Sequence, residues 1–502
     1  MKKIFLYIAI VLSVSSCKKY LSEDSRSNIA TQDFYKTKAD FTLAVNGIYL
    51  QLYQPYTFPT YASLPFSMIE LATGQYTLSR TISGESTSFY NLQYPQGGIY
   101  VRIYWQSYYR GIEGANNVIT KIAAIDDATI NAADKSTIMG EASFLRAYFY
   151  YNLVNIFGAV PLKLTPTIDP NNALLPKTSV KDIYEKVIIP DLLIAEKANL
   201  PQSPAGNGRI SIGAAKTLLA KAYLSMSGQP VNDVSKVVLA RDKALEVINS
   251  KAFQLFQSDP GGVSWFEKLN NPAFNNLEEI IWDLNYTRQS QNSPLVAYFL
   301  PNSYFNPLIT SSVVQLGTFS PSPALINSYA TNDLRGKYQF GFFYNQLTLD
   351  GTMLTFDNWY SNKYFDKSVI KPGSGLISGL NTHLLRYSDL LLTYAEAQNE
   401  ADGGPNSTSY DAVNSIRTRA GLAVINNLSK QDFKNEVWME RYWELNYEGQ
   451  LWFDIVRTRK VFDGVGFQDI IGFKSPSGAV FTEKNLTFPI PLSEIQINPL
   501  LK

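Results

Sequence analysis

Hydrophobic residues recur at the spacing of an α-helix in several separate stretches of this chain. In the first, Phe41, Ala44, Val45, Ile48 and Leu52 fall on one face of a helix. Later stretches alternate small alanines with large apolar residues, which is typical of antiparallel helix pairs in tetratricopeptide arrays, although no clean repeat of that length is present. The pattern predicts a mainly α protein. Its other helices are expected over residues 138–156 (ending at Gly158), 180–195 (kinked at Pro190), 215–226, 240–248, 387–400 and 410–422.

Two long segments interrupt this helical pattern, and we call them the first insert (Pro55–Tyr104) and the second insert (Asp259–Gly379). Both are rich in Gly, Pro, Ser, Asn and aromatic residues. Short alternating pieces at Glu279–Tyr286 and Lys337–Tyr344 predict strands of small sheets or hairpins. Because loops this long inside a compact domain are usually functional, we expect ligand contacts in the inserts.

The first residues have the layout of an export signal. Lys2 and Lys3 precede the apolar run Ile4–Val14, and small serines follow before Cys17. The run is shorter than the ~20 residues that cross a bilayer as a helix. Residues 1–16 are therefore predicted to be a cleaved signal peptide.

Cys17 is the only cysteine of the chain, and the Val-Ser-Ser-Cys sequence ending there resembles a bacterial lipobox. An ordinary signal peptide with a chance cysteine is the alternative. Two or three acyl chains, at ~0.8 kcal/mol per buried methylene, would anchor the protein stably. We predict a lipid on Cys17, a polar tether over residues 17–32, and a single domain over 33–502 whose stability depends on its core, since no internal disulfide can form.

The charge of the chain is nearly balanced. It has 44 basic and 43 acidic residues, and cleavage of the signal peptide removes two of the basic ones, Lys2 and Lys3. Such a chain has no electrostatic case for binding nucleic acid. A hydrophobic content of 45% with 17% charged residues is typical of a globular protein.

His383 is the only histidine, so a Ser-His-Asp arrangement would depend on this one residue, and a histidine-based metal site is excluded by number. We predict a structural role for His383. Asp357 and Asn358 offer oxygen ligands that could hold a structural calcium ion, but without the spacing of an EF-hand the signal is weak, and no cofactor is predicted.

Three glutamates, Glu440, Glu444 and Glu448, recur every four residues and would stack on one helical face. Such stacking is unfavourable without basic partners, so the pattern favours a structural ion-pair network over the paired acids of a glycosidase. The expected bases are Arg441, Arg457 and Arg459 for these glutamates, and Arg386 and Arg417 for Asp389 and Glu396.

Eight segments of the chain resemble, in the same order, those of the SusD/RagB family of surface lipoproteins of Bacteroidota. The N-terminal SusD-like part spans about residues 20–230 and the C-terminal SusD/RagB part about 270–502. One departure is Leu451, where many members have arginine. The segments are CKKYLSED, EASFLRAYFYYNLVNIFGAVPL, GRISIGAAKTLLAKAYLSM, SPALINSYATNDLR, HLLRYSDLLLTYAEAQNE, AVNSIRTRAGL, VWMERYWELNYEGQLWFDIVRTRK and FPIPLSEIQINPLL.

The resemblance implies a non-catalytic binding protein with a tetratricopeptide-like scaffold and ligand-binding loops. Family members are held on the outer membrane by their lipid and cap a SusC-like TonB-dependent transporter, to which they deliver an oligosaccharide. Three alternatives stay open at this point. They are a RagB-like peptide binder, a lipid-anchored glycosidase, and a helical adaptor that binds only protein.

Aromatic residues of the inserts are the best candidates for ligand contacts, because a tyrosine ring covers the apolar face of a pyranose while its hydroxyl forms hydrogen bonds. Most of the 32 Tyr, 28 Phe and 7 Trp residues must nonetheless pack in the core. We assign Trp265, Phe266 and Trp282 to the core and Trp105 to the start of a helix. The predicted ligand-binding residues are Tyr76, Arg80, Tyr90 and Tyr94 in the first insert and Tyr298, Tyr304, Asn306, Trp359 and Tyr360 in the second.

Overall fold

The structure of the chain is a computed structural model. It describes residues 34–57, 64–79, 84–169, 173–204, 206–288, 292–301, 317, 319–336, 341–349, 351–370 and 377–502. Residues 1–33, with the predicted signal peptide, Cys17 and the whole predicted tether, lie outside this part.

Helices make up most of the regular structure, and the longest are α5 and α6. None of the described helices has both the length and the apolar character needed to cross a bilayer. The α-helices are α2 (Lys38–Tyr49), α3 (Ser67–Leu71), α4 (Gly84–Tyr90), α5 (Ile99–Ala123), α6 (Ala132–Phe157), α7 (Val180–Ile183), α8 (Ile189–Glu196), α9 (Ile212–Ser227), α10 (Lys236–Ser250), α11 (Trp265–Leu269), α12 (Pro294–Phe299), α13 (Pro323–Ser328), α14 (Tyr387–Ala401), α15 (Ser407–Arg419), α16 (Lys430–Glu444), α17 (Gln450–Thr458) and α18 (Leu492–Ile497).

The described strands form two-stranded antiparallel sheets, and two of these connect distant parts of the chain. A strand of the first insert pairs with one of the second, with Tyr76 opposite Pro321. Another pair places Ile280 opposite Arg386 and so connects a strand inside the second insert to the strand that follows the insert. The pairs are β1 (Tyr76–Leu78) with β5 (Phe319–Pro321), β2 (Val160–Pro161) with β3 (Lys177–Thr178), β4 (Ile280–Leu284) with β8 (Thr382–Arg386), β6 (Phe343–Leu349) with β7 (Thr352–Ser361), and β9 (Lys460–Phe462) with β10 (Phe467–Asp469).

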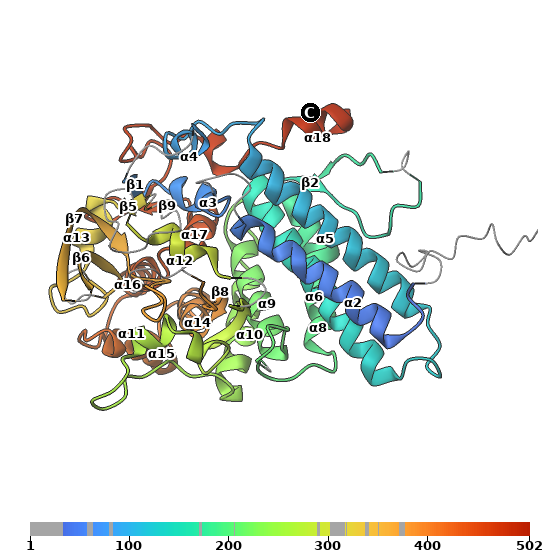
Figure 1. The fold of residues 1–502 in the computed structure, drawn as a ribbon, viewed down its shortest axis with the longest axis horizontal. Helices are drawn as coiled ribbons and strands as arrows, with labels where there is room; N and C mark the ends of the chain where they lie inside the picture. The colour runs from blue at the N-terminus through green and yellow to red at the C-terminus, as the bar shows by residue number, and fades with distance from the viewer. Residues whose placement is uncertain are drawn as a thin grey trace, which may run out of the picture.

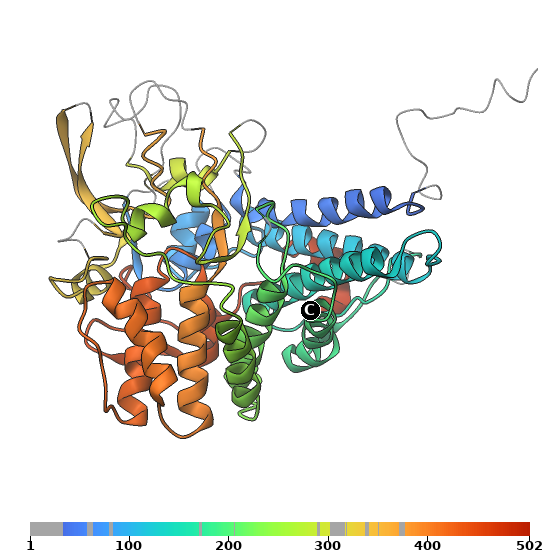
Figure 2. The same ribbon diagram turned by 90° about the horizontal axis from the view of Figure 1, so that it is seen from below.

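The scaffold helices form two groups that lie side by side. Figure 1 shows α2, α5, α6 and α8 on one side, with α9 and α10 between them and the C-terminal helices α14, α15 and α16. Figure 2 shows that strands and short helices of the second insert lie on the side opposite the C-terminal helices. The scaffold therefore presents the insert on one face of the molecule.

The helices predicted from apolar spacing are confirmed as α2, α6, α7 with α8, α9, α10, α14 and α15. Near Pro190 the structure shows one turn of π-helix, η3 (Tyr184–Ile188), between α7 and α8. Pro190 lacks an N–H and cannot continue an α-helical hydrogen-bond pattern, which accounts for the irregular turn just before it. The strand predicted at Glu279–Tyr286 is confirmed as β4. Of Lys337–Tyr344, residues 337–340 lie outside the described part, and β6 begins at Phe343.

The first insert ends earlier than the sequence predicted, because α5 begins at Ile99 and not near Trp105. Trp105 lies inside this helix and packs against Tyr109 and Phe157. The start of α5 is rich in aromatic residues of modest helix propensity, so its stability comes from burial. A carboxylate from α4 caps it, since Glu85 accepts hydrogen bonds from the N–H groups of Ile99 (2.6 Å) and Tyr100 (3.1 Å).

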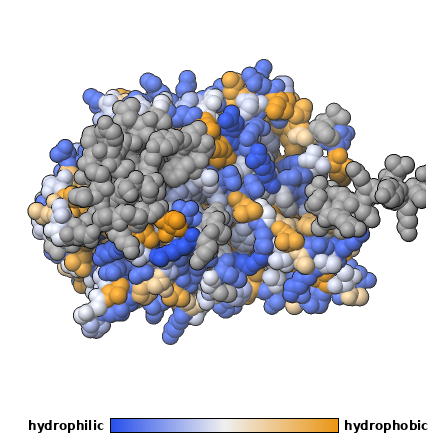
Figure 3. Space-filling view, in the orientation of Figure 1, coloured by the Kyte–Doolittle hydropathy of each residue, from blue (hydrophilic) through white to orange (hydrophobic). Residues whose placement is uncertain are grey.

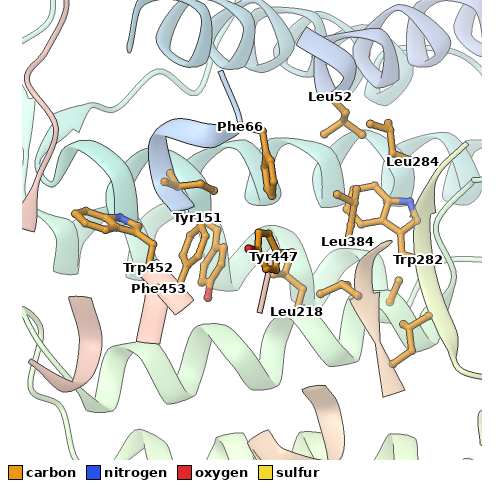
Figure 4. Close-up of a cluster of buried hydrophobic side chains, with 14 of the residues drawn as sticks. Leu52, Phe66, Tyr151, Leu218, Trp282, Leu284, Leu384, Tyr447, Trp452 and Phe453 are labelled. Atoms are coloured by element: carbon orange, nitrogen blue, oxygen red, sulfur yellow. The ribbon is translucent and has the colours of Figure 1, made fainter. Parts of the chain in front are cut away.

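The hydrophobic core runs between the two groups of helices. Figure 4 shows Tyr151 of α6, Leu218 of α9, Trp282 of β4 and Phe453 of α17 in one cluster of buried side chains. The rings of Tyr151 and Phe453 stack at 5.7 Å. Trp282 packs edge-on against two aromatic rings of α6, which confirms its assignment to the core. This core holds the second insert in place at β4, because Trp282 of that strand is part of the core.

Candidate functional site

Two of the predicted ligand-binding residues, Tyr76 and Tyr298, lie in the core. Both are fully buried and pack against the same ring, that of Phe319. The hydroxyl oxygen of Tyr76 also accepts a hydrogen bond from the N–H of Tyr447 at 3.0 Å. The structure thus brings these tyrosines together, but their side chains have no exposed surface to offer a ligand. The expectation that they line the site is corrected for this reason.

Tyr90 and Tyr94 lie at the end of α4 and just after it, and both are half-buried. The Tyr94 hydroxyl donates to the carbonyl oxygen of Asn485 at 3.1 Å, and its ring packs against Phe89 and Phe488. Burial raises the pKa of the Tyr90 hydroxyl. Tyr94 therefore lies beside the C-terminal segment, and a ligand-binding role for either tyrosine stays a prediction.

Trp359 and Tyr360 lie next to each other on β7, where successive side chains point to opposite faces. Tyr360 is buried against Tyr344 and Phe356, whereas Trp359 is half-buried. Arg80, Tyr304 and Asn306 lie outside the described residues. Their predicted role stays a prediction, as does that of Trp359.

The second insert contains a cleft of about 500 Å³, a volume within the usual range for small-ligand sites. One wall comes from α11 and the residues after it, and the other from the turn that follows β7. The cleft combines two phenylalanine rings with amides, hydroxyls and three charged groups. Its lining residues are Ser264, Phe266, Glu267, Asn270, Asn271, Asn362, Phe365, Asp366, Lys367 and Ser368.

Buried amides hold the two walls of the cleft together. The Asn270 Oδ1 accepts from the N–H of Tyr364 at 2.6 Å, while its Nδ2 donates to the carbonyl oxygen of Phe266 at 2.9 Å. On the second wall, the Asn362 Nδ2 donates to the carbonyl oxygen of Gly341 at 2.8 Å. The hydrogen bonds of Asn270 tie α11 directly to the turn after β7, so the cleft is preformed.

The charged side chains of the cleft differ in how firmly their neighbours hold them in place. Asp366 is buried, and its carboxylate accepts from the Oγ of Ser368 (2.6 Å) and the Oγ of Ser378 (2.6 Å). Lys367 is exposed, and its Nζ lies 3.5 Å from the Oε2 of Glu267 across the cleft. The Asp366 charge is therefore fixed in place, whereas the Glu267–Lys367 pair is free to rearrange.

Phe266 was assigned to the core from the sequence, but it is only half-buried. It packs against Trp265 and Phe342, and another part of its ring lines the cleft. Phe365, the second ring of the lining, is 8% exposed. The sequence feature that could have identified Phe266 and Phe365 as cleft residues was their position in the long second insert. A flat apolar ring beside amides and hydroxyls can bind a molecule with apolar faces and many hydroxyl groups.

Hydrophobic residues are scattered over the face of the molecule seen in Figure 3. The visible hydrophobic residues of the described chain form small separate groups among hydrophilic ones.

Two family models match the chain, one described as the SusD family over residues 350–502 and one described as "Starch-binding associating with outer membrane" over residues 19–224. A solved SusD superfamily protein from Parabacteroides distasonis is 33% identical, with a TM-score of 0.85 over 93% of this chain and 98% of that one. This chain belongs to the SusD family. The resemblance and the mainly α fold predicted from the sequence are confirmed.

Other SusD-like proteins are similar along the whole chain. SusD-like protein P25 of Formosa agariphila is 25% identical, covering 100% of this chain and 97% of its own. Surface glycan-binding protein A of Bacteroides uniformis has a TM-score of 0.75 over 93% of this chain and 99% of that one. At 20% identity, the second similarity shows the fold alone.

Glu440 and Glu444 of this SusD-like protein stack one turn apart on α16 as predicted, and both contact Arg335. Glu448 does not join this stack, because α16 ends at Glu444 and the chain turns through the left-handed Tyr447 before Glu448. The three glutamates still converge on buried bases, so the predicted ion-pair network is present. We call it the buried charge network. Its members are Glu279, Asp333, Arg335, Lys363, Arg386, Arg419, Glu440, Glu444 and Glu448, with Arg417 at its edge.

Arg386 lies at the centre of the network. Its guanidinium donates to Glu448 (2.8 Å), Glu279 (2.6 Å) and Glu444 (3.2 Å). Burial alone would raise the pKa of Glu444, but Arg419 and Arg386 outweigh it and lower this pKa to about 2. Glu444 is therefore ionised at neutral pH and held in structural ion pairs.

The basic partners expected from the sequence were wrong. Arg441 pairs with Asp389 and Asp454, each at 2.8 Å, and Arg459 lies 3.9 Å from Glu483. Glu396 is held by Arg457 at 2.6 Å, and Asp389 also pairs with Lys221. Neither Arg386 nor Arg417 contacts the two acids assigned to them, because partners meet across the fold and not along one helix.

His383 is buried and held at both ring nitrogens. Its Nδ1 lies 2.7 Å from Asp283 Oδ1 and its Nε2 lies 3.0 Å from the carbonyl oxygen of Leu269. Burial would lower the pKa of His383, but Asp283 outweighs it and raises this pKa. The residue thus has the structural role predicted, joining β8 to β4 and to the end of α11.

The described residues contain no group of three or more His, Cys, Asp or Glu side chains placed to hold a metal ion. Asp357, the acid considered for calcium, lies exposed on β7.

Proposed function

We propose that this protein is a non-catalytic carbohydrate-binding lipoprotein of the outer-membrane surface, which captures an oligosaccharide and delivers it to a SusC-like TonB-dependent transporter. Membership of the SusD family supports the proposal, as do the starch-binding, outer-membrane description of one matched model and the glycan-binding name of a structural neighbour. The observation that carries it is the cleft, which places aromatic rings and amides within the predicted functional insert.

The cleft matches the chemistry of a sugar better than that of an apolar ligand. Phe266 offers a partly exposed ring for the C–H face of a pyranose, and Asn270, Asn271 and Asn362 surround it with amide groups. The short-chain serines add hydroxyls. A volume of about 500 Å³ suits a few sugar residues. Of a longer glycan, only a short segment would therefore lie in the cleft.

Attachment to the membrane rests on Cys17. Lipidation there would leave the domain on a tether of about 16 residues, which spans at most roughly 50 Å when extended. The protein would then stay close to the membrane and to a transporter embedded in it. Replacing Cys17 by Ser should release the protein from the membrane fraction, whereas retention there would contradict the proposed anchor.

Calorimetric titration of the detergent-solubilised full chain tests the binding function. The titrants are neutral oligosaccharides of plant, microbial and host type together with mixed peptides. Phe266→Ala should weaken the binding of a carbohydrate about tenfold, since an aromatic stacking contact contributes on the order of 1 kcal/mol in addition to its buried area. Phe473→Ala is the matched control, because Phe473 is also half-buried against another ring, that of Phe481, but does not line the cleft.

The same samples separate the alternative functions. Chromatography of each ligand after the titration should show it intact, and a shortened glycan would support the glycosidase. Heat with peptides alone would support a RagB-like peptide binder. If the Phe266→Ala variant binds carbohydrate with unchanged affinity, the binding site does not lie in the cleft.

A further inference from the structure

We propose that the cleft selects neutral glycans and discriminates against chains that bear carboxylate or sulfate groups. The inference rests on the proposed function and names the class of ligand for the same site. It comes from the distribution of fixed charge around the cleft, which the near-neutral total charge of the chain does not reveal.

A fixed negative charge lies in the cleft wall. Asp366 is 1% exposed, and its Oδ1 also accepts the N–H of Ser368 at 3.0 Å, in addition to the two serine hydroxyls. Three hydrogen bonds hold the carboxylate, so it cannot swing away from an incoming anion. Within the described residues no Lys or Arg nitrogen lies within 4.0 Å of it. A ligand carboxylate or sulfate in the cleft would face this charge across a short distance.

The nearby cations already have partners. Lys367, the one cation of the lining, pairs with Glu267, while Arg288 donates to the Oγ of Ser368 at 2.7 Å. Behind the walls, Lys363 pairs with Glu448 and Lys268 with Asp259. An anionic ligand could gain a cation only by displacing the Lys367–Glu267 contact or the hydrogen bond from Arg288 to Ser368, and it would lose hydration on entering the cleft.

Neutral hydroxyl groups, in contrast, find suitable partners. The Nδ2 of Asn271 and the Oδ1 of Asn362 make no hydrogen bond to another described residue, so the lining offers one donor and one acceptor beside the Phe266 ring. Amides bind hydroxyls without the cost of desolvating a charge. The cleft therefore fits an uncharged sugar more readily than a uronate or a sulfate ester.

Pairs of oligosaccharides that differ only in charge give the sharpest test. Cello-oligosaccharides against β-1,4-glucuronan fragments, and β-1,4-manno-oligosaccharides against oligomannuronates, each compare a hydroxymethyl group with a carboxylate on the same linkage. Each is titrated into the detergent-solubilised full chain at low and at high salt. In any pair of which a member binds, the neutral oligosaccharide should bind at least about tenfold tighter than the acidic one. This ratio of affinities should shrink at high salt, because ions screen the repulsion between the ligand carboxylate and Asp366.

Asp366→Asn locates the origin of the selectivity. It removes the charge but keeps the size of the side chain, and it should reduce the ratio between the affinities for the neutral and the acidic oligosaccharide of a pair about tenfold. Glu267→Gln, at a half-buried position, is a second variant in case Asp366→Asn fails to fold, and it should reduce the affinity ratio by a smaller factor. A thermal melt of each variant confirms folding.

The outcomes separate the inference from the proposed function. If acidic members bind as tightly as the neutral ones or more tightly, selection by charge is wrong while carbohydrate capture stands. If both variants leave the difference unchanged, the cleft charge is not its cause and the inference is overturned. If no saccharide binds and peptides do, the proposed function fails and the inference fails with it.

Discussion

The N-terminal helices and the C-terminal part of this SusD-like protein are held together by different interactions. In the N-terminal group, α5 and α6 pack through apolar and aromatic side chains, and the buried pair Arg146–Asp191 connects α6 to α8. In the C-terminal part, the buried charge network joins β4, β8, α15, α16 and the second insert.

The difference shows how the insert is positioned. Apolar contacts are not directional, and a packed helix pair tolerates changes of shape that keep its volume. Buried charges are stable only when every partner is in place. Because Lys363 lies at the start of the turn that forms one wall of the cleft, its bond to Glu448 (2.6 Å) ties that wall to the scaffold. The network therefore sets where the cleft lies.

The largest expected effect comes from breaking the network at its centre. Arg386→Met leaves Glu279, Glu444 and Glu448 short of a buried partner, and we expect the free energy of unfolding to fall by about 3–5 kcal/mol. Urea unfolding followed by circular dichroism measures it.

The matched control is Arg241→Met. Arg241 pairs with Asp242 and Asp402, whose side chains are about half exposed, and such surface pairs contribute about 0–1 kcal/mol. Equal losses in the two variants would mean that the network contributes no more than a surface ion pair.

A somewhat smaller effect is expected from Glu70 of α3, a buried acid beside the network. Its Oε1 accepts the N–H of Gly449 at 2.5 Å, and burial raises the pKa of Glu70 to about 7. The folded protein therefore keeps a proton between pH 4.5 and 7 that the unfolded chain releases. Stability should fall by about 3 kcal/mol as pH rises through this range.

Glu70→Gln removes this dependence, because the amide does not titrate. Urea unfolding at a series of pH values should show a shallower decline in the variant than in the parent protein. The contribution assigned to Glu70 would be ruled out by parallel curves.

The smallest effect is expected where a pair is replaced as a whole. Arg146→Met combined with Asp191→Leu removes both charges of the N-terminal pair, so neither is left buried alone. The main cost is at Asn116, whose Oδ1 loses its donor at 2.7 Å, and we expect about 1–2 kcal/mol. If the free energy of unfolding falls as much as in Arg386→Met, the N-terminal helices depend on their buried charges as strongly as the C-terminal part does.

Local patterns of the sequence predicted most of the scaffold. The spacing of Phe41, Val45 and Ile48 is enough to define α2, because helical periodicity depends only on residues a few positions apart. The start of α5 escaped prediction, since its cap comes from Glu85 and its stability from burial. The same local information indicated that the second insert carries function, but not which of its aromatic rings reach the surface.

Sequence alone determined the helical class, the near-neutral charge, the presence of a single histidine and a single cysteine, and the family resemblance, since composition, short-range spacing and motif order are local properties. Tertiary structure decided that Tyr76 is buried under Tyr447 while Phe266 lines a cleft, and that Glu448 meets Arg386 instead of a base on its own helix. Burial and ion pairing depend on contacts between residues far apart in the chain, and these exist only once the chain has folded.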